Sequence, residues 1–203
     1  MRKGEKCYVI RSAKQMAALA AAARQEILDV LAGMGSVSIA ELAASLGRPP
    51  DALYFHIRAL KQVGLVRQVG RRRRGGRTEA LFRTVAPDLL LEYEPRNECN
   101  RKAVTAIVSS MLRLGIRDFK RAFERADAIV AGPKRELWAL RKTARLSLAQ
   151  IASLNQSIEQ VRGNVAQPHG GGRLYGITIL LTPLDHRRRE TKRSKRSQRA
   201  RTK

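Results

Sequence analysis

The segment 38–66 constrains the fold of this chain more than any other part of the sequence, because it contains consecutive signals for helix starts and ends. Ser38 and Glu41 have the spacing of a capping box, in which each side chain accepts a hydrogen bond from the backbone N–H of the other residue. The short helix that they begin is expected to end at Gly47. Proline is tolerated in a first helical turn, so a second helix is expected to begin near Pro50. The segment therefore predicts two short helices joined by a tight turn.

Apolar residues at helical spacing flank this turn on both sides. Residues 15–31 are rich in Ala, Leu and Ile and are predicted to form one helix that ends at Gly33 and Gly35. The helix that begins near Pro50 is expected to end at Gly64 and to bury a face made of Leu53, Ile57, Leu60 and Val63. The helices together predict an aliphatic core, consistent with an aromatic content of only 4%.

A β-hairpin with an arginine-rich loop is expected after the last of these helices. Residues 65–69 and 79–85 have strand-like composition, and the glycine-containing loop 70–78 separates them. The loop contains five arginines, Arg71, Arg72, Arg73, Arg74 and Arg77. Guanidinium groups bind phosphate oxygens in a two-point geometry and enter narrow minor grooves, whereas a loop that only aids solubility gains nothing from five of them. The hairpin therefore predicts contact with a polyanion.

The order helix, short helix, turn, helix and basic hairpin is that of a winged helix-turn-helix, whose second paired helix enters the major groove of DNA. Residues 24–66 have the sequence RQEILDVLAGMGSVSIAELAASLGRPPDALYFHIRALKQVGLV and resemble the arsenic-repressor-like (ArsR) superfamily. The runs 53–60 and 63–66 are similar to that family's recognition helix and its exit into the first wing strand. The resemblance covers residues 15–86 and implies a DNA-binding transcriptional regulator. More weakly, residues 87–185 resemble the dimerisation and effector part of some such regulators.

The cysteines depart from the pattern of the metal-sensing members of that family. Those members have paired cysteines at the recognition helix, whereas Cys7 and Cys99 lie far apart and outside it. Two thiols and three histidines in this arrangement predict neither a disulfide framework nor a metal site, and no cofactor is expected. A small-molecule effector would therefore bind elsewhere, and the sequence does not identify one.

We expect the turn and the exposed side of the recognition helix to contact DNA together with the wing arginines. The candidate residues outside the wing are Arg48, Asp51, Tyr54, Phe55, Arg58 and Lys61. Tyr54 and Arg58 are expected to touch base edges or phosphates, whereas Phe55 either contacts DNA or packs the helix against its neighbours. Asp51 is expected to cap the recognition helix, because carboxylates are favoured near helix N-termini.

Two further helices are predicted in the second half of the chain, over 100–126 and 133–162, followed by a strand over 174–181. From Leu137 to Val161 the second helix keeps apolar or small residues at alternating spacings of three and four, which is typical of a coiled-coil seam. The same spacing fits two helices packed within one chain. The sequence leaves both arrangements open.

These features predict a mainly α protein with a small β-hairpin, of α+β class. The chain is expected to divide into an N-terminal arm 1–14, a winged helix-turn-helix domain 15–86, a connector 87–99, a helical dimerisation and effector region 100–185 with a late strand, and a disordered basic tail 186–203.

The net charge of +24 concentrates at the two ends of the chain. Residues 1–86 contain 16 basic and 6 acidic side chains, and residues 186–203 contain 10 and 1. Such a balance predicts a polyanionic partner. No nucleophile elbow, phosphate-binding loop or paired-carboxylate spacing predicts an enzyme. No apolar run has the length of a membrane span, so a cytoplasmic, nucleoid-associated protein is expected.

Two functional hypotheses follow from the sequence. The leading one is a homodimer that binds double-stranded DNA with sequence specificity and pairs its subunits through residues 100–162. The alternative is a non-specific nucleoid-associated or RNA-binding protein, in which the wing and the basic tail provide the affinity.

Overall fold

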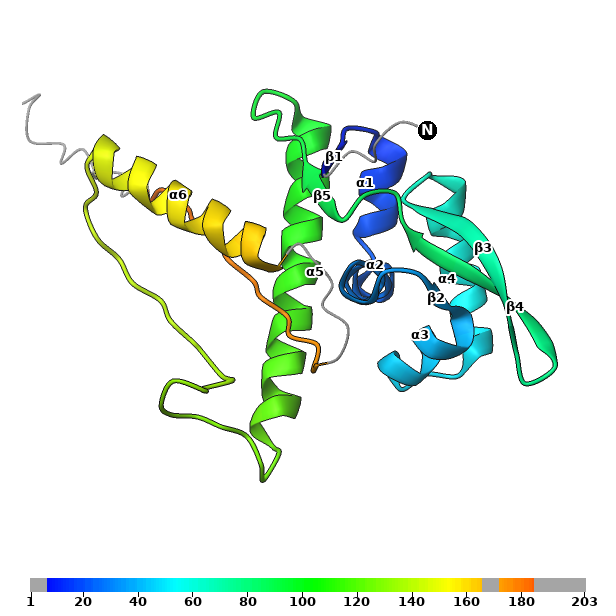
Figure 1. Ribbon diagram of the computed structural model, residues 1–203. Helices are drawn as coiled ribbons and strands as arrows, with labels where there is room; N and C mark the ends of the chain where they lie inside the picture. Colours follow the sequence, from blue (N-terminus) through cyan, green and yellow to red (C-terminus); the bar gives the residue numbers. More distant parts are fainter. Residues whose placement is uncertain (1–6, 166–171, 185–203) are drawn as a thin grey trace, which may run out of the picture.

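The computed structural model describes residues 7–165 and 172–184 (Figure 1). Its class is mainly α with small sheets, as predicted. The elements in chain order are β1 (Cys7–Ile10), α1 (Ala13–Leu19), α2 (Ala22–Met34), β2 (Val37–Ser38), α3 (Ile39–Leu46), α4 (Pro50–Gln62), β3 (Val66–Arg74), β4 (Arg77–Thr84), β5 (Asp88–Leu91), α5 (Glu98–Phe123) and α6 (Leu148–Val165).

Helices α2, α3 and α4 and the antiparallel sheet β2–β4–β3 form a winged helix-turn-helix. The capping box at the start of α3 is confirmed, since the Ser38 N–H donates to Glu41 Oε2 over 2.9 Å and the Glu41 N–H donates to Ser38 Oγ over 3.3 Å. The core between these elements is aliphatic, and its most deeply buried members are Ile27, Leu31, Leu53, Leu60 and Leu65. Burial of these side chains fixes which face of α4 is left for solvent.

The predicted single helix over 15–31 is wrong, because the chain breaks between α1 and α2. Ala21 has an extended backbone, with φ −89° and ψ 119°. The break lets α1 turn its own face to the core, where Gln15 donates from Nε2 to the Tyr8 hydroxyl and to the Val63 carbonyl oxygen, each over 2.9 Å. A run of alanines favours helix everywhere, so only these tertiary contacts reveal the break.

A parallel strand pair joins the predicted arm to the predicted connector. Strand β1 pairs with β5 in the register Cys7 to Asp88 through Ile10 to Leu91. Both strands are four residues long and lie far apart in the sequence, so neither has a turn beside it that predicts a hairpin. The pairing closes the winged domain, because its first and last segments lie side by side (Figure 1).

The wing differs from the predicted loop 70–78 in one important respect. The turn of the hairpin consists only of Gly75 and Gly76, with φ of 55° and 77°, which suits the tight two-residue turns that twist with the strands. The wing arginines therefore belong to strands β3 and β4. A bulge between Gln68 and Gly70 shifts the register of β3 and sets which face of the hairpin each following side chain takes.

Helix α5 agrees closely with its predicted span and packs against α1 and α2 (Figure 1). Asn97 caps it by accepting from the Asn100 N–H over 3.2 Å, and Gln25 of α2 donates from Nε2 to the Ile107 carbonyl oxygen over 3.0 Å. Among the residues that the structure describes, Leu114 is the last buried side chain.

Helix α6 is shorter than the predicted helix 133–162. Residues 133–147, the first half of the predicted helix, are not helical. A second capping box explains the true start, since the Ser147 N–H donates to Gln150 Oε1 over 2.9 Å and the Gln150 N–H donates to Ser147 Oγ over 3.3 Å. The predicted strand over 174–181 is extended chain without a strand partner among the described residues. Leu174 and Thr178 of this segment lie close to Gly33 of α2 and Gly115 of α5, respectively. The predicted tail 186–203 lies outside the described residues.

None of the described helices is both long and apolar enough to cross a membrane.

Candidate nucleic-acid interface

The exposed side of α4 presents the recognition-helix residues that the sequence predicted. Leu53, Ile57 and Leu60 face the core, which leaves Tyr54 and Phe55 with 55% and 69% of their surface exposed. Arg58 and Lys61 are exposed on the same helix. The side of α4 that is free of the core therefore offers two aromatic rings and two cations.

The N-terminus of α4 does not use Asp51 as its cap, contrary to the sequence-based expectation. Pro49 occupies the N-cap position and no side chain caps the helix there. Asp51 lies exposed in the first turn, where its charge still opposes the positive end of the helix dipole. The prolines fix the backbone that the cap would otherwise stabilise.

A groove of about 590 Å³ separates α4 from the wing. One wall is α4 with Tyr54, Arg58 and Lys61, and the other is β4 with Arg77 and Thr78. The start of α3 closes one end of the groove. Three cations, one phenol and the carboxylate of Glu79 thus line a single channel between α4 and the wing.

One face of the wing is occupied by ion pairs with acidic residues of the same chain. Arg72 lies across the hairpin from Glu79, and Arg74 lies across from Arg77. Glu41 of α3 reaches this face, with Oε1 at 2.6 Å from Arg72 Nη2 and 3.3 Å from Arg74 Nη1. Two of the five wing arginines therefore already have a carboxylate partner.

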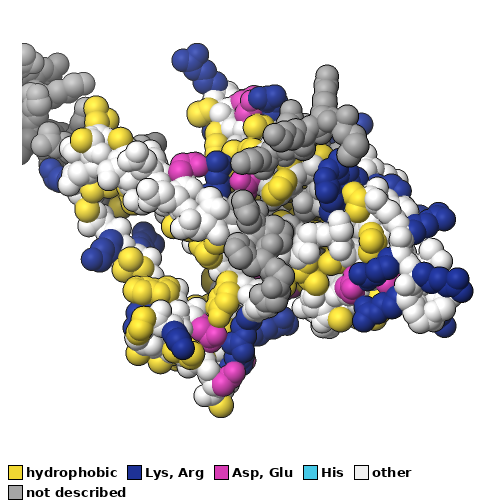
Figure 2. Space-filling view, viewed as in Figure 1, with side chains coloured by type: hydrophobic (Ala, Val, Ile, Leu, Met, Phe, Trp, Pro, Cys, Tyr) yellow, Lys and Arg dark blue, Asp and Glu magenta, His cyan; other side chains and the backbone are white. Residues whose placement is uncertain are grey.

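The opposite face of the wing is open. Arg71 and Arg73 lie across from Ala80 and Thr78, and both of those residues line the groove beside α4. Because side chains alternate along a strand, Arg71 and Arg73 share the face of these two partners. Within residues 7–165 and 172–184, no acidic side chain forms an ion pair with Arg71, Arg73 or Arg77. Figure 2 shows Lys and Arg side chains gathered over the wing.

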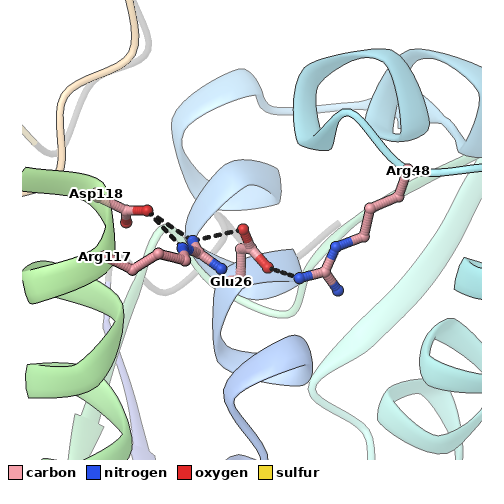
Figure 3. A network of polar contacts seen from close by, with 4 residues as sticks. All are labelled: Glu26, Arg48, Arg117 and Asp118. Carbon is pink, nitrogen blue, oxygen red and sulfur yellow. Dashed lines mark hydrogen bonds and ion pairs between the residues drawn. The ribbon is translucent and has the colours of Figure 1, made fainter. Parts of the chain in front are cut away.

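Arg48, in the turn before α4, does not line the groove and belongs to a polar network with Glu26, Arg117 and Asp118 (Figure 3). Its Nη2 lies 2.5 Å from Glu26 Oε2 on α2, and Glu26 Oε1 lies 2.7 Å from Arg117 Nη2 on α5. Arg117 also pairs with Asp118 over 2.6 Å. The network connects the turn of the helix-turn-helix to α5. Arg48, which was expected to contact DNA, is paired with Glu26 instead.

His56 lies half-buried on α4. Burial, followed by the positive charges of Arg24 and Arg48, lowers the pKa of His56. Its ring meets Phe55 edge-on, with centroids 5.6 Å apart. A neutral imidazole in this position supports packing of α4 and adds no charge to the interface at neutral pH.

Glu26 and Glu41 are the site residues that sequence reasoning missed. The capping-box spacing identified Glu41 as part of a helix start, but one oxygen of its carboxylate caps α3 while the other pairs with strand β3. Nothing local in the sequence marks such a pairing. Glu26 has no motif of its own and is identified only by the fold.

Residues 19–69 match the model of a helix-turn-helix domain family. The chain contains a helix-turn-helix domain. The match begins at the end of α1 and extends into β3, so it spans the capped α3, the turn and the whole of α4. The matched family does not distinguish an ArsR-like subfamily.

No curated protein matches the chain. A solved structure that matches is the crystal structure of RV1404 from Mycobacterium tuberculosis, at 13% sequence identity and a TM-score of 0.28. The match covers 78% of this chain and 86% of that one. The assignment of the helix-turn-helix domain therefore rests on the family match and on the order of the elements.

The described residues contain no group of three or more His, Cys, Asp or Glu side chains placed to hold a metal ion.

Proposed function

We infer that the protein is a transcriptional regulator that binds double-stranded DNA with sequence specificity, with α4 in the major groove and the open face of the wing on the backbone or minor groove. The observation that carries this proposal is the groove between α4 and β4, which Arg58, Lys61 and Arg77 line together. A cationic channel beside an exposed recognition helix fits a duplex, whose phosphates run next to the base edges that the helix contacts.

The residues of the interface take different roles in this proposal. Tyr54 and Arg58 contact base edges, and Phe55 contacts an apolar base surface such as a thymine methyl group. Lys61 and Arg77 bind phosphates along the groove, and Arg71 and Arg73 do so on the open face of the wing. Arg48 stays with Glu26 and orients the turn. Asp51 supports the start of α4 and keeps the helix N-terminus from binding phosphate indiscriminately.

The proposed regulator is a homodimer, because the second half of the chain carries two apolar stripes that no described residue buries. On α5 the stripe repeats at spacings of four, three and four, and consists of Leu112, Ile116, Phe119 and Phe123. On α6 it repeats at spacings of three and four, and consists of Ile151, Leu154, Ile158, Val161 and Val165. Both stripes have the spacing of a helix–helix seam, and Figure 2 shows hydrophobic side chains exposed over this part of the molecule. Two copies joined here would place two α4 helices for half-sites about one turn of DNA apart, ~34 Å.

The test of the DNA proposal is selection from random duplexes followed by binding measurements on the enriched sequence. Enrichment of a defined, symmetric motif is expected. Arg58→Ala should lower affinity for that motif by about 1–3 kcal/mol and relax preference at one position in each half-site. Arg141→Ala, an exposed arginine outside the winged domain, is the matched control and should change neither.

The test of the dimer is sedimentation of the full chain and of Ile116→Asp. The wild type should sediment as a dimer at micromolar concentration and Ile116→Asp as a monomer, because a carboxylate in an apolar seam is uncompensated. A wild-type monomer would overturn this part of the proposal and leave the DNA part standing.

The rival function, non-specific binding to DNA or RNA, makes the opposite predictions. Selection would recover no motif, and deletion of residues 186–203 would remove nearly all affinity for any duplex. The proposal expects that deletion to lower affinity for specific and random duplexes by the same factor, because a charge run contacts only phosphates.

A further inference from the structure

We propose that Glu41 is a specificity-determining residue, an electrostatic clamp that withholds Arg72 and Arg74 from phosphates and so lowers affinity for DNA of any sequence. The inference rests on the proposed function, in which the wing binds DNA. Its consequence is that only three of the five wing arginines, Arg71, Arg73 and Arg77, are free to contribute to binding in the wild-type protein.

The two carboxylate oxygens of Glu41 have different partners, one in the backbone at the start of α3 and the other in the wing. Oε2 accepts the Ser38 N–H over 2.9 Å and completes the start of α3. Oε1 faces the wing and lies 2.6 Å from Arg72 Nη2 and 3.3 Å from Arg74 Nη1. The helix cap therefore fixes the position of the carboxylate, and the position of the carboxylate fixes two guanidinium groups. A preorganised carboxylate competes with a phosphate better than a mobile one does.

The surroundings of Arg72 reinforce the clamp. Its Nη2 also lies 3.7 Å from Glu79 Oε2, its neighbour across the hairpin. Both Nε and Nη2 of Arg72 are shielded from solvent. To reach a phosphate, Arg72 would have to leave two carboxylates, and these would then face the DNA unpaired. Repulsion between carboxylate and phosphate would offset the new contact.

The backbone hydrogen bond from Ser38, followed by the pairing with Arg72, lowers the pKa of Glu41, so the clamp is charged at neutral pH. Arg71 and Arg73 have no such competitor among the described residues. Their side chains lie on the face of the hairpin that they share with Ala80 and Thr78. Strand alternation places Arg71 and Arg73 on one face of the hairpin and Arg72, Arg74 and Arg77 on the other. Glu41 pairs with two of the three arginines on that second face.

The decisive variant is Glu41→Gln, because glutamine serves at this position of a capping box while the charge is lost. Binding to a random duplex is measured over a range of salt concentrations. Each phosphate contact contributes about −0.9 to the slope of log K against log salt concentration, so release of two arginines should steepen the slope by about 1–2 for each bound wing. Affinity for random DNA should rise, and the ratio of specific to random affinity should fall.

The matched control is Glu98→Gln, which removes one exposed negative charge from α5, where Glu98 pairs with Lys102 and with no other described residue. It should leave the salt slope unchanged. The triple variant Glu41→Gln, Arg72→Ala, Arg74→Ala should lose the whole of the added slope. Urea midpoints of every variant establish that each one is folded.

Three outcomes separate the clamp from the function on which it rests. A steeper slope in Glu41→Gln that disappears in the triple variant supports the clamp. An unchanged slope in a folded Glu41→Gln, while Arg71→Ala still weakens binding, overturns the clamp and leaves the proposed function intact. Failure of the wild type to bind any duplex, with Arg71→Ala and Arg73→Ala equally inactive, overturns the proposed function itself.

Discussion

Residues 7–114 and residues 124–184 contain the same kinds of local interaction but differ in what surrounds them. Each region has a capping box, a carboxylate shared between two partners, and leucines at helical spacing. In the first region these features surround one aliphatic core. In the described part of the second region, no side chain is buried. The difference teaches that local signals produce stable tertiary structure only where a common core connects them.

The leucines of the two regions give the largest expected contrast. Leu60 of α4 is 0% exposed and Leu140 is 73% exposed. Leu60→Ala should lower the free energy of unfolding by about 2–5 kcal/mol, because it leaves a cavity in the core. Leu140→Ala should change it by less than about 0.5 kcal/mol. Urea unfolding followed by far-ultraviolet circular dichroism measures both, and equal effects would erase the distinction between the regions.

The shared carboxylates give the next contrast. Glu26 pairs with Arg48 and Arg117, whereas Glu136 pairs with Arg173 and accepts from the Tyr175 hydroxyl over 2.9 Å. Glu26→Gln should cost about 2 kcal/mol, because two guanidinium groups lose their carboxylate between packed helices.

Glu136→Gln should leave the main unfolding transition in place, because none of the residues in its network is buried. Its effect should appear instead in the emission of Trp138, the single tryptophan, which lies two residues away. A shift of the main transition by Glu136→Gln would show that the two regions unfold together.

The capping boxes give a smaller contrast between two chemically equivalent sites. Ser38→Ala should lower the free energy of unfolding by about 1 kcal/mol, the usual value for an N-cap. Ser147→Ala should fray the start of α6 and leave the main transition unchanged. Hydrogen exchange of the first-turn amides distinguishes these results, and equal losses of global stability would contradict the comparison.

The smallest expected effect is the pH dependence contributed by Glu41. Its folded-state pKa is lowered from 4.5, so its stabilising contribution is present above that value and is lost as the pH falls through the folded-state pKa. The stability difference between the wild type and Glu41→Gln should therefore shrink below about pH 4.5. Urea midpoints measured from pH 7 downwards test this, and a difference that stays constant into strong acid would count against the pairing.

Much of the winged domain was predictable because its signals are local. The capping box at Ser38 and Glu41, the apolar face of α4 and the exposure of Tyr54 and Arg58 all follow from spacing along one helix. The break at Ala21 and the pairing of β1 with β5 were not predictable, because each depends on contacts between residues distant in the sequence. The helix predicted over 133–162 begins only at Leu148, after the capping box of Ser147 and Gln150, and the spacing of the apolar residues did not reveal that start.

The sequence by itself determined the order of the elements, the face of α4 that stays exposed, and the excess of arginine in the wing. Only the tertiary structure decided which arginines remain free. The two-residue turn at Gly75 and Gly76 and the bulge before Gly70 set the alternation along β3, and the fold brings α3 to one face of the hairpin. The number of charged residues follows from the sequence, but which of them form ion pairs depends on the distances between them in the folded chain. Glu41 and Arg72 come within 2.6 Å of each other only because α3 packs beside the hairpin.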